Sequence, residues 1–347
     1  MAKKRTYGVG IIGTGWVAAA HVMNFKKIDA TQVVAICSRT KSRADAFVRE
    51  QELSDAGTYT KVADFLKHDG LDIGVIATPH PNHPAETIAA ARAGKHIVIE
   101  KPVALTAGEL RKMVAEVNKT KVKTSICFEL RWCGASQNIK AMLDQNLIGN
   151  VHYGHTAYHH GIGPWYAQWK WNRKKQMAGS AELTAGCHAV DLLIWLMNTR
   201  VSHVSAMSVK GKRNTLKYDY ETVSTVNLQF VSGAIGNVST NIECRQPYLF
   251  PILLQGDKGS IWNDKVSTTD WPTTQGWAHV PSAQPDSGDV NDHPYLGQFE
   301  YFIDCLQNNR RPHNDLRNAA HAHEICFAIQ QSVRTNKTVQ VARTPGT

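Results

Sequence analysis

The sequence has 347 residues, enough for two domains, and 42% of them are apolar, as in a globular protein with a substantial core. The net charge of +10 is dispersed without a run of five like charges, which argues against a nucleic-acid-binding protein. No apolar run approaches the ~18 residues that span a bilayer. Seven scattered cysteines without a C-x-x-C pair argue against a disulfide framework and structural zinc. We therefore expect a cytoplasmic protein that binds neither nucleic acid nor membrane.

The chain begins with the pattern of a dinucleotide-binding turn. Tyr7–Ile12 is an apolar run suited to a strand buried on both faces of a parallel sheet. Gly13 and Gly15 permit a tight turn and a close approach of the backbone to a pyrophosphate. Ala18 stands in the place of a third glycine and still lets the following helix pack closely on the strand.

The second predicted strand, Gln32–Cys37, decides which dinucleotide is favoured. An acidic residue after this strand would bind the ribose hydroxyls of NAD, but this sequence has Ser38 and Arg39 there. An arginine can bind a 2′-phosphate, which favours NADP. The same side chain can stack on adenine or lie solvated in the loop, so NAD and NADP both stay open.

Two further buried strands, Leu71–Ala77 and His96–Glu100, end in segments with functional potential. The first is followed by the proline-rich segment 78–84, which cannot continue the strand or begin a helix before Pro84. The second ends in Glu100-Lys101-Pro102 and delivers Lys101 to the carboxyl edge of the sheet, where ligands bind in open α/β sheets. We assign cofactor binding to Gly13, Thr14, Gly15, Trp16, Val17, Ser38, Arg39, Thr78, Pro79, His80, His83, Glu100 and Lys101.

Helices alternate with these strands as far as Ile126. Thr106 and Glu109 have the spacing of a capping box at the start of the last of these helices. This alternation predicts a doubly wound parallel sheet, which makes residues 1–126 an NAD(P)-binding Rossmann domain. The predicted helices are Ser42–Gln51, Ala85–Ala93 and Ala107–Lys119.

The pattern changes after residue 126, and residues 127–347 form a second, substrate-binding domain. Thr222–Phe230 and Ala234–Ile242 alternate polar and apolar residues, which predicts an antiparallel sheet with one covered face. Trp271–Asp292 is rich in Gly, Pro and Ser and predicts a long loop. Other predicted elements are a strand at Val151–Tyr158 and helices at Ser136–Asn146, Tyr295–Asn308 and Arg317–Thr335.

The chain resembles the Gfo/Idh/MocA family, which includes glucose–fructose oxidoreductase and inositol dehydrogenase. The matching motifs are the Gly13/Gly15/Ala18 turn, Ala77-Thr78-Pro79 with His83, Ala93-Gly94-Lys95-His96 leading to Glu100-Lys101-Pro102, Gly149-Asn150-Val151, Gly186-x-His188-x-x-Asp191, and Phe299–Leu306 followed by Arg311-Pro312. The resemblance implies a Rossmann domain and an α+β domain with an open, mostly antiparallel sheet. It also implies a carbohydrate substrate, NAD or NADP, and a homodimer or homotetramer formed through the face of that sheet.

The resemblance assigns catalytic roles to two residues. Lys101 matches the family lysine that lies between nicotinamide and substrate, and His188 matches the histidine that acts as acid and base. These types suit hydride transfer from an alcohol, which needs a base for the hydroxyl proton and a donor for the developing alkoxide. The alternatives are a surface lysine at a strand end and a core histidine at a helix start.

Thr184 departs from the family pattern, which commonly has aspartate four residues before the histidine. Threonine cannot supply the negative charge that raises the basicity of an imidazole. Three alternatives follow: His188 works without a carboxylate, Glu182 or another acid substitutes, or the chemistry differs. Glu182 lies two positions away and would point elsewhere on a regular element.

An aromatic stretch between Tyr158 and Tyr166 is suited to the apolar faces of a sugar ring. The alternative is that its tryptophans fill the domain junction, and Arg131 could instead form a structural ion pair. No metal site is expected, since the histidines lack an H-E-x-x-H pattern. We assign substrate binding to Lys101, Arg131, His160, Trp165, Tyr166, Thr184 and His188.

The sequence thus predicts an NAD(P)-dependent enzyme that interconverts a secondary alcohol and a ketone on a sugar, glycoside or cyclitol. The alternative is a lyase, glycosidase or epimerase that holds NAD tightly and acts through transient oxidation to a keto-sugar, and Thr184 keeps this alternative open. A third hypothesis is a dinucleotide sensor without catalysis, against which Lys101 and His188 both count.

Overall fold

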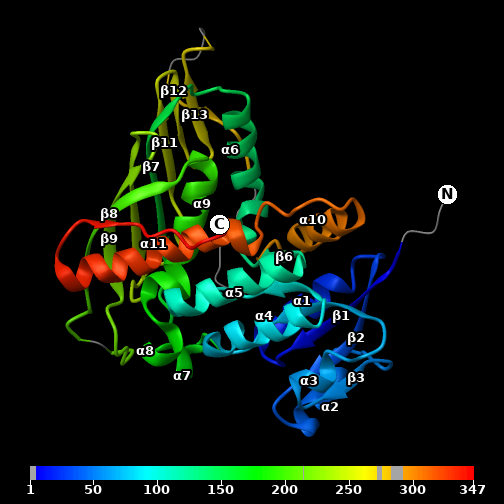
Figure 1. Cartoon of the computed structure of the whole chain (residues 1–347). Coiled ribbons are helices and arrows are strands. Elements are labelled where there is room, and N and C mark those ends of the chain that lie inside the picture. The colour runs from blue at the N-terminus through cyan, green and yellow to red at the C-terminus, as the bar shows by residue number, and fades with distance from the viewer. Residues whose placement is uncertain (1–4, 214, 272–275, 283–291) are drawn as a thin grey trace. The chain divides into compact units, whose positions relative to one another are not determined.

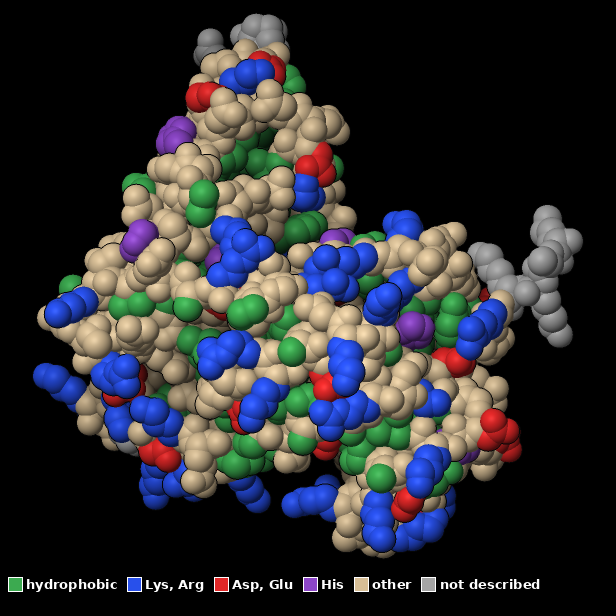
Figure 2. All heavy atoms as spheres, in the orientation of Figure 1, with side chains coloured by type: hydrophobic (Ala, Val, Ile, Leu, Met, Phe, Trp, Pro, Cys, Tyr) green, Lys and Arg blue, Asp and Glu red, His purple; other side chains and the backbone are tan. Residues whose placement is uncertain are grey.

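The computed structural model describes residues 5–213, 215–271, 276–282 and 292–347 (Figure 1). The chain forms two compact units. The first consists of Met1–Cys127, Pro294–Ala320 and Thr344–Thr347, and the second of Phe128–His293 and His321–Arg343. The segment 294–320 therefore belongs to the same unit as the N-terminal residues. Lys and Arg side chains are spread over the face of the molecule seen in Figure 2.

The first unit contains a six-stranded sheet in the order β3-β2-β1-β4-β5-β6, with every recorded pair parallel. This confirms the predicted doubly wound sheet, although the three-residue strand β3 was not predicted. The order reverses between β1 and β4, which is the position where such sheets bind dinucleotides. The strands are β1 (Tyr7–Ile12), β2 (Thr31–Cys37), β3 (Gly57–Tyr59), β4 (Leu71–Ile76), β5 (His96–Ile99) and β6 (Thr124–Ile126).

Helices of the first unit follow the predicted alternation. Thr106 and Glu109 form both hydrogen bonds of the capping box at the start of α5. The prediction that no helix begins before Pro84 is wrong: the 3₁₀ helix η1 (His80–Asn82) leads into α4 at His83, and Pro84 lies in the first turn, where no amide donor is needed. The helices are α1 (Trp16–Phe25), α2 (Lys41–Glu50), α3 (Val62–Phe65), α4 (His83–Arg92), α5 (Ala107–Thr120) and α10 (Tyr295–Gln307).

The second unit contains a nine-stranded sheet in the order β14-β13-β12-β11-β7-β10-β9-β8-β15. The prediction of an open, mostly antiparallel sheet is confirmed, with one parallel pair, β7 with β10. The strands are β7 (Val151–His159), β8 (Val201–Val209), β9 (Val223–Phe230), β10 (Ile235–Asn241), β11 (Ile252–Gly256), β12 (Gly259–Trp262), β13 (Lys265–Thr268), β14 (Ala278–His279) and β15 (Val339–Gln340). Strand β14 corrects part of the predicted loop Trp271–Asp292; residues 272–275 and 283–291 of that segment lie outside the described residues.

The buried face of this sheet positions helix α9 (Cys187–Met197). A Cβ atom at Gly154 would come within 2.8 Å of Leu193, so the missing side chain lets α9 lie close to β7. Thr156 on β7 donates to the carbonyl of Ala189 at 2.8 Å, which fixes the first turn of α9. The remaining helices are η2 (Glu129–Trp132), α6 (Gly134–Asp144), α7 (Trp169–Asn172), α8 (Lys175–Ala178), the π-helix η3 (Glu182–Gly186) and α11 (Leu316–Thr335). Among the helices described, none is both long and apolar enough to cross a membrane.

Candidate active site

The turn between β1 and α1 has the features that a pyrophosphate needs. Gly13 has φ of 116°, and a Cβ atom there would lie 2.3 Å from the carbonyl oxygen of Ala77, so only glycine fits. Gly15 is the N-cap of α1, and nothing lies within 4 Å of the position its Cβ would take. Helix α1 has no side-chain cap and no acidic residue in its first turn, so the positive end of the helix dipole suits an anion. These residues therefore fit a dinucleotide phosphate.

The loop after β2 lies beside this turn. The hydroxyls of Thr14 and Ser38 are 2.9 Å apart and form a hydrogen bond between the two loops. Arg39 is exposed, and its guanidinium forms no hydrogen bond or ion pair with any other residue in the described part of the chain. An exposed guanidinium at this position is chemically suited to a phosphate or to an adenine ring.

The segment after β4 is held by a buried histidine. His83 lies between two backbone carbonyls, with Nε2 2.7 Å from the oxygen of Thr78 and Nδ1 2.8 Å from the oxygen of Pro102. Burial lowers the pKa of His83, and the two carbonyls oppose that shift. The side chain thus joins the loops that follow β4 and β5. The Thr78 hydroxyl donates to Glu86 at 2.5 Å, and burial raises the pKa of that carboxyl to about 7.

Glu100 points into the protein at the carboxyl end of β5. Its carboxylate lies 2.9 Å from His21 Nε2, accepts from the Tyr295 hydroxyl at 3.2 Å, and accepts from the Lys101 amide at 3.2 Å. Burial alone raises the pKa of Glu100, but the hydrogen bond with His21 and the nearby positive charges outweigh it and bring the pKa to about 2. Glu100 is therefore an ionised, buried anchor for the backbone of Lys101, and its predicted contact with the cofactor stays a prediction.

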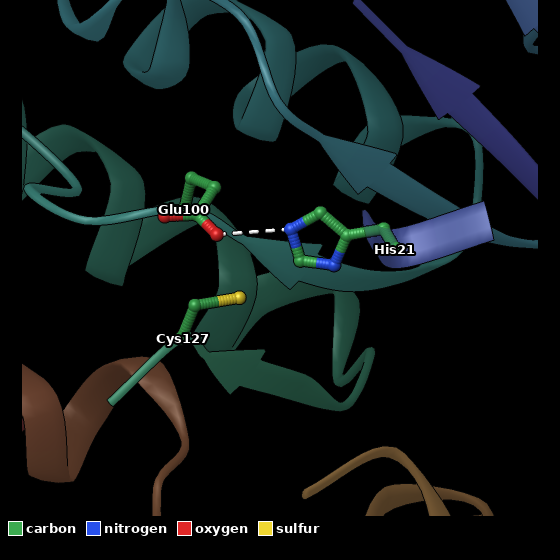
Figure 3. A group of neighbouring side chains, drawn as sticks. All are labelled: His21, Glu100 and Cys127. Carbon is green, nitrogen blue, oxygen red and sulfur yellow. Dashed lines mark hydrogen bonds and ion pairs between the residues drawn. The ribbon is translucent and has the colours of Figure 1, made fainter. Parts of the chain in front are cut away.

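Figure 3 shows His21, Glu100 and Cys127 side by side. One ligand atom of each of the three side chains lies within 4.8 Å of the other two. Such side chains bind zinc in other proteins. Here His21 and Glu100 are joined directly by a hydrogen bond, so the buried carboxylate already has its compensating partner. The cluster is explained without an ion, and we assign no metal to it.

His188 lies in the first turn of α9 and is 3% exposed. Its Nδ1 atom is 3.7 Å from Oε1 of Glu129, a residue of η2 that is itself 1% exposed. The ring of Tyr158 stacks on the imidazole at a centroid distance of 6.0 Å and an angle of 15°. Phe128 meets the same ring edge-on at 6.0 Å. His188 therefore combines aromatic packing with a nearby carboxylate.

Arg131 is paired with Asp191 in the interior. The guanidinium donates to both carboxylate oxygens, at 2.7 and 2.5 Å, and both side chains are at most 4% exposed. Burial raises the pKa of Asp191, against the effect of the arginine. This is the structural ion pair that the sequence left as an alternative for Arg131. A substrate contact of Arg131 stays a prediction.

Rings of the aromatic stretch 158–166 lie beside His160 and His188 in the second unit. His160 is buried and lies 5.0 Å from the ring of Trp165 and 5.2 Å from the ring of Tyr248. Trp165 is 54% exposed and donates from its indole to the carbonyl of Gly161 at 3.0 Å. Tyr166 packs against a buried cluster that includes Tyr218 and Tyr220. Tyr158, which stacks on His188, packs against the same buried cluster as Tyr166.

Comparison with known proteins identifies the family. Residues 7–128 match the oxidoreductase family with an NAD-binding Rossmann fold, GFO_IDH_MocA, and residues 136–262 match the GFO/IDH/MocA C-terminal domain. The chain belongs to the Gfo/Idh/MocA family of oxidoreductases. It therefore carries an NAD-binding Rossmann fold, and it is an enzyme.

Relatives of this Gfo/Idh/MocA protein include proteins of differing activity. A D-apiose dehydrogenase from Paraburkholderia graminis is 25% identical, over 95% of this chain and 88% of the relative. A glycosyl hydrolase family 109 protein from Shewanella pealeana is 26% identical, over 74% of this chain and 63% of the relative. A solved structure of levoglucosan dehydrogenase in complex with NADH has the same fold, with a TM-score of 0.86, 19% identity and coverage of 98% and 100% of the two chains.

Residues that sequence reasoning missed in this Gfo/Idh/MocA protein are His21, Glu129 and Tyr248. Thr184, at the position of the expected aspartate, donates to the side-chain oxygen of Asn172 at 2.7 Å. Glu182 forms no ion pair with the described residues, whereas Glu129 lies beside His188. The signal for Glu129 and for His21 was a charged or polar side chain within a run of apolar neighbours, which buries it and demands a partner.

Proposed function

We propose that this protein is an NAD(P)-dependent dehydrogenase that interconverts a secondary alcohol and a ketone on a sugar, glycoside or cyclitol. The observation that carries the proposal is His188, a buried imidazole with a carboxylate near its Nδ1 atom and aromatic rings beside it. Relatives named as dehydrogenases of D-apiose and levoglucosan support a carbohydrate substrate. The dinucleotide turn at Gly13 and Gly15 supports the cofactor.

In this proposal Lys101 and His188 are the two catalytic residues. NAD(P)⁺ supplies a hydride acceptor when bound. His188 takes the hydroxyl proton, Lys101 donates a hydrogen bond to the oxygen as negative charge develops there, and the carbinol carbon becomes a carbonyl carbon. The proton passes from His188 to water after the ketone forms. Tyr158, His160, Trp165 and Tyr166 pack on the ring of the sugar.

The outward face of the nine-stranded sheet supports a homodimer or homotetramer. Met207 and Val209 on β8 and Ile235 on β10 are 71%, 61% and 57% exposed. The pairing of β8, β9 and β10 puts these side chains on one face, with Ser205 opposite Asn227 and Asn227 opposite Asn237. Apolar side chains on one exposed face favour association of copies. Light scattering of wild type and of Ile235→Lys tests this, with the variant expected to shift towards the monomer.

A second candidate function has its own support. A relative is named a glycosyl hydrolase family 109 protein, and Thr184 replaces the expected aspartate. In that reading the protein is a glycosidase, lyase or epimerase with tightly held NAD that is reduced and reoxidised in each turnover. The two candidates differ in stoichiometry, because a dehydrogenase forms reduced cofactor in proportion to product.

The deciding experiment is a panel of monosaccharides, cyclitols and glycosides incubated with NAD and with NADP and followed at the nicotinamide absorbance. Product analysis on the same samples measures turnover. Equal amounts of reduced cofactor and ketone support the dehydrogenase. Product without net cofactor reduction supports the second candidate. Absence of turnover across the panel contradicts both.

A further inference from the structure

We infer that Glu129 is the positioning residue that orients His188 and raises its basicity for proton transfer. Glu129 would thus take the role of the aspartate that the family commonly has where this chain has Thr184. The inference rests on the proposed function, in which His188 is the base. It selects one of the three alternatives that the sequence left open, namely substitution by another acid. The acid comes from η2, 59 residues before the histidine, and no local pattern around Thr184 points to it.

The distance and the burial of the two groups carry the argument. Oε1 of Glu129 lies 3.7 Å from Nδ1 of His188, and the two side chains are 1% and 3% exposed. At this separation a carboxylate favours the protonated form of an imidazole, whereas burial opposes it. With Nδ1 turned to Glu129, Nε2 is the nitrogen that we assign to the substrate hydroxyl. An acid that faces the distal nitrogen of a catalytic histidine is a recurrent arrangement in enzymes.

A second connection between the same two elements fixes this geometry. Arg131, two residues after Glu129 on η2, makes the bidentate ion pair with Asp191, one turn after His188 on α9. Helices η2 and α9 are thus joined at two points one turn apart. Because the Arg131 charge is matched by Asp191, it is not the counter-charge of Glu129. The basic side chains recorded beside Glu129 are His188 at 3.7 Å and His293 at 3.4 Å.

Titratable groups from several described elements lie beside the pair. Tyr158 on β7 stacks on His188, and His293 lies 3.4 Å from the same oxygen of Glu129. Burial and the negative charge of Glu129 together raise the pKa of Tyr248, and they raise the pKa of Cys133 to about 12. Those two groups therefore stay neutral beside Glu129. A proton on His188 or on His293 would supply a positive charge to compensate the carboxylate.

The first test is the pH profile of Glu129→Gln. Without the carboxylate, the neutral form of His188 persists to lower pH, so the acidic limb of kcat/KM for alcohol oxidation moves down by about one pH unit. The rate above that limb falls about tenfold because the base is weaker. The KM for the dinucleotide stays unchanged. The matched control is Glu182→Gln, a buried carboxylate in η3, which leaves the limb in place.

Rescue provides the second test. Thr184→Asp, introduced into Glu129→Gln, puts an acid back at the family position and is expected to recover part of the lost rate. An active Glu129→Gln enzyme with the wild-type limb and rate overturns the inference and leaves the proposed function intact. Should glutamine prevent folding, Glu129→Asp retains the charge on a shorter side chain; we expect a kcat about three- to tenfold lower, and wild-type kcat in that variant overturns the inference.

A measurement without substrate distinguishes a failure of this inference from a failure of the proposed function. The imidazole signal of His188, assigned with His188→Gln, is titrated by NMR in the full chain with and without Glu129→Gln. The inference predicts that the pKa of His188 falls by about one unit in the variant. An unchanged titration overturns it. A wild-type enzyme that turns over no carbohydrate contradicts the proposed function, whatever the titration shows.

Discussion

Two buried glutamates each face a histidine, Glu100 with His21 in the first unit and Glu129 with His188 in the second. Glu100 is held at 2.9 Å by His21 and also accepts from Tyr295 and from the amide of Lys101. Glu129 lies 3.7 Å from His188 and 3.4 Å from His293. The first carboxylate has several close donors and keeps its charge. The second shares looser contacts with two imidazoles, an arrangement in which protons can be exchanged. We therefore propose that the same pair of residue types serves as an anchor in one unit and as a proton-transfer pair in the other.

The largest expected effect concerns Lys101, whose backbone amide donates to Glu100. Lys101→Met removes the ammonium group but leaves the backbone bond to Glu100, so we expect kcat to fall about 10³-fold or more while cofactor affinity stays nearly intact. Steady-state turnover assays measure kcat, and fluorescence titration with the dinucleotide measures cofactor affinity. Lys112→Met, on the helix α5, is the matched control. Normal activity of Lys101→Met would defeat the catalytic assignment and favour a dinucleotide sensor.

Replacing each of the two histidines in turn with glutamine tests the comparison directly. His188→Gln should lower kcat/KM about 10²- to 10³-fold with little change in the thermal midpoint, because the base is lost. His21→Gln should lower the midpoint by several degrees and kcat/KM by less than tenfold, because a buried carboxylate loses its counter-charge. Steady-state kinetics and thermal unfolding of both variants provide the four values. The opposite pattern would reverse the roles of the two pairs.

The lowered pKa of Glu100 also predicts how the free energy of unfolding depends on pH. The pKa of Glu100 is lowered to about 2 in the folded chain from its ordinary value of 4.5, so the unfolded chain binds the proton more readily. The stabilisation is complete above about pH 4.5 and is lost as the pH falls towards about 2. Glu100→Gln should therefore cost on the order of 1–3 kcal/mol at pH 7, and its difference from wild type should shrink in acid. Urea unfolding at several pH values tests this. Asp29→Asn, at an exposed position, should show no such dependence.

The smallest expected effect concerns the choice of cofactor. Arg39→Ala removes an exposed guanidinium next to Ser38, and we expect KM for NADP to rise about tenfold while KM for NAD changes less than threefold. Initial rates with both dinucleotides measure this. Equal changes in the two KM values would instead indicate that Arg39 stacks on the adenine.

Much of the fold follows from local patterns, whereas the two glutamate–histidine pairs do not. The apolar run at β1, the capping box at Thr106 and the alternation along β9 each depend on residues a few positions apart, and the structure confirms all three. His21 and Glu100 are 79 residues apart, and their contact depends on the order of strands and on α1 packing beside them. Glu129 reaches His188 through the packing of η2 and α9. Such contacts arise from tertiary structure, and single-sequence periodicity carries no record of them.

The return of residues 294–320 to the first unit has a consequence for dissecting this enzyme. The backbone passes between the units four times, at 127/128, 293/294, 320/321 and 343/344. A fragment that stops at residue 126 would lack Phe299, whose ring lies flat on Phe25 at 4.3 Å, and would deprive Glu100 of Tyr295. Neither half can be obtained by a single cut. A soluble nucleotide-binding fragment would need the helix α10 grafted back on, and exchange of substrate halves between relatives must transplant two separate stretches of chain.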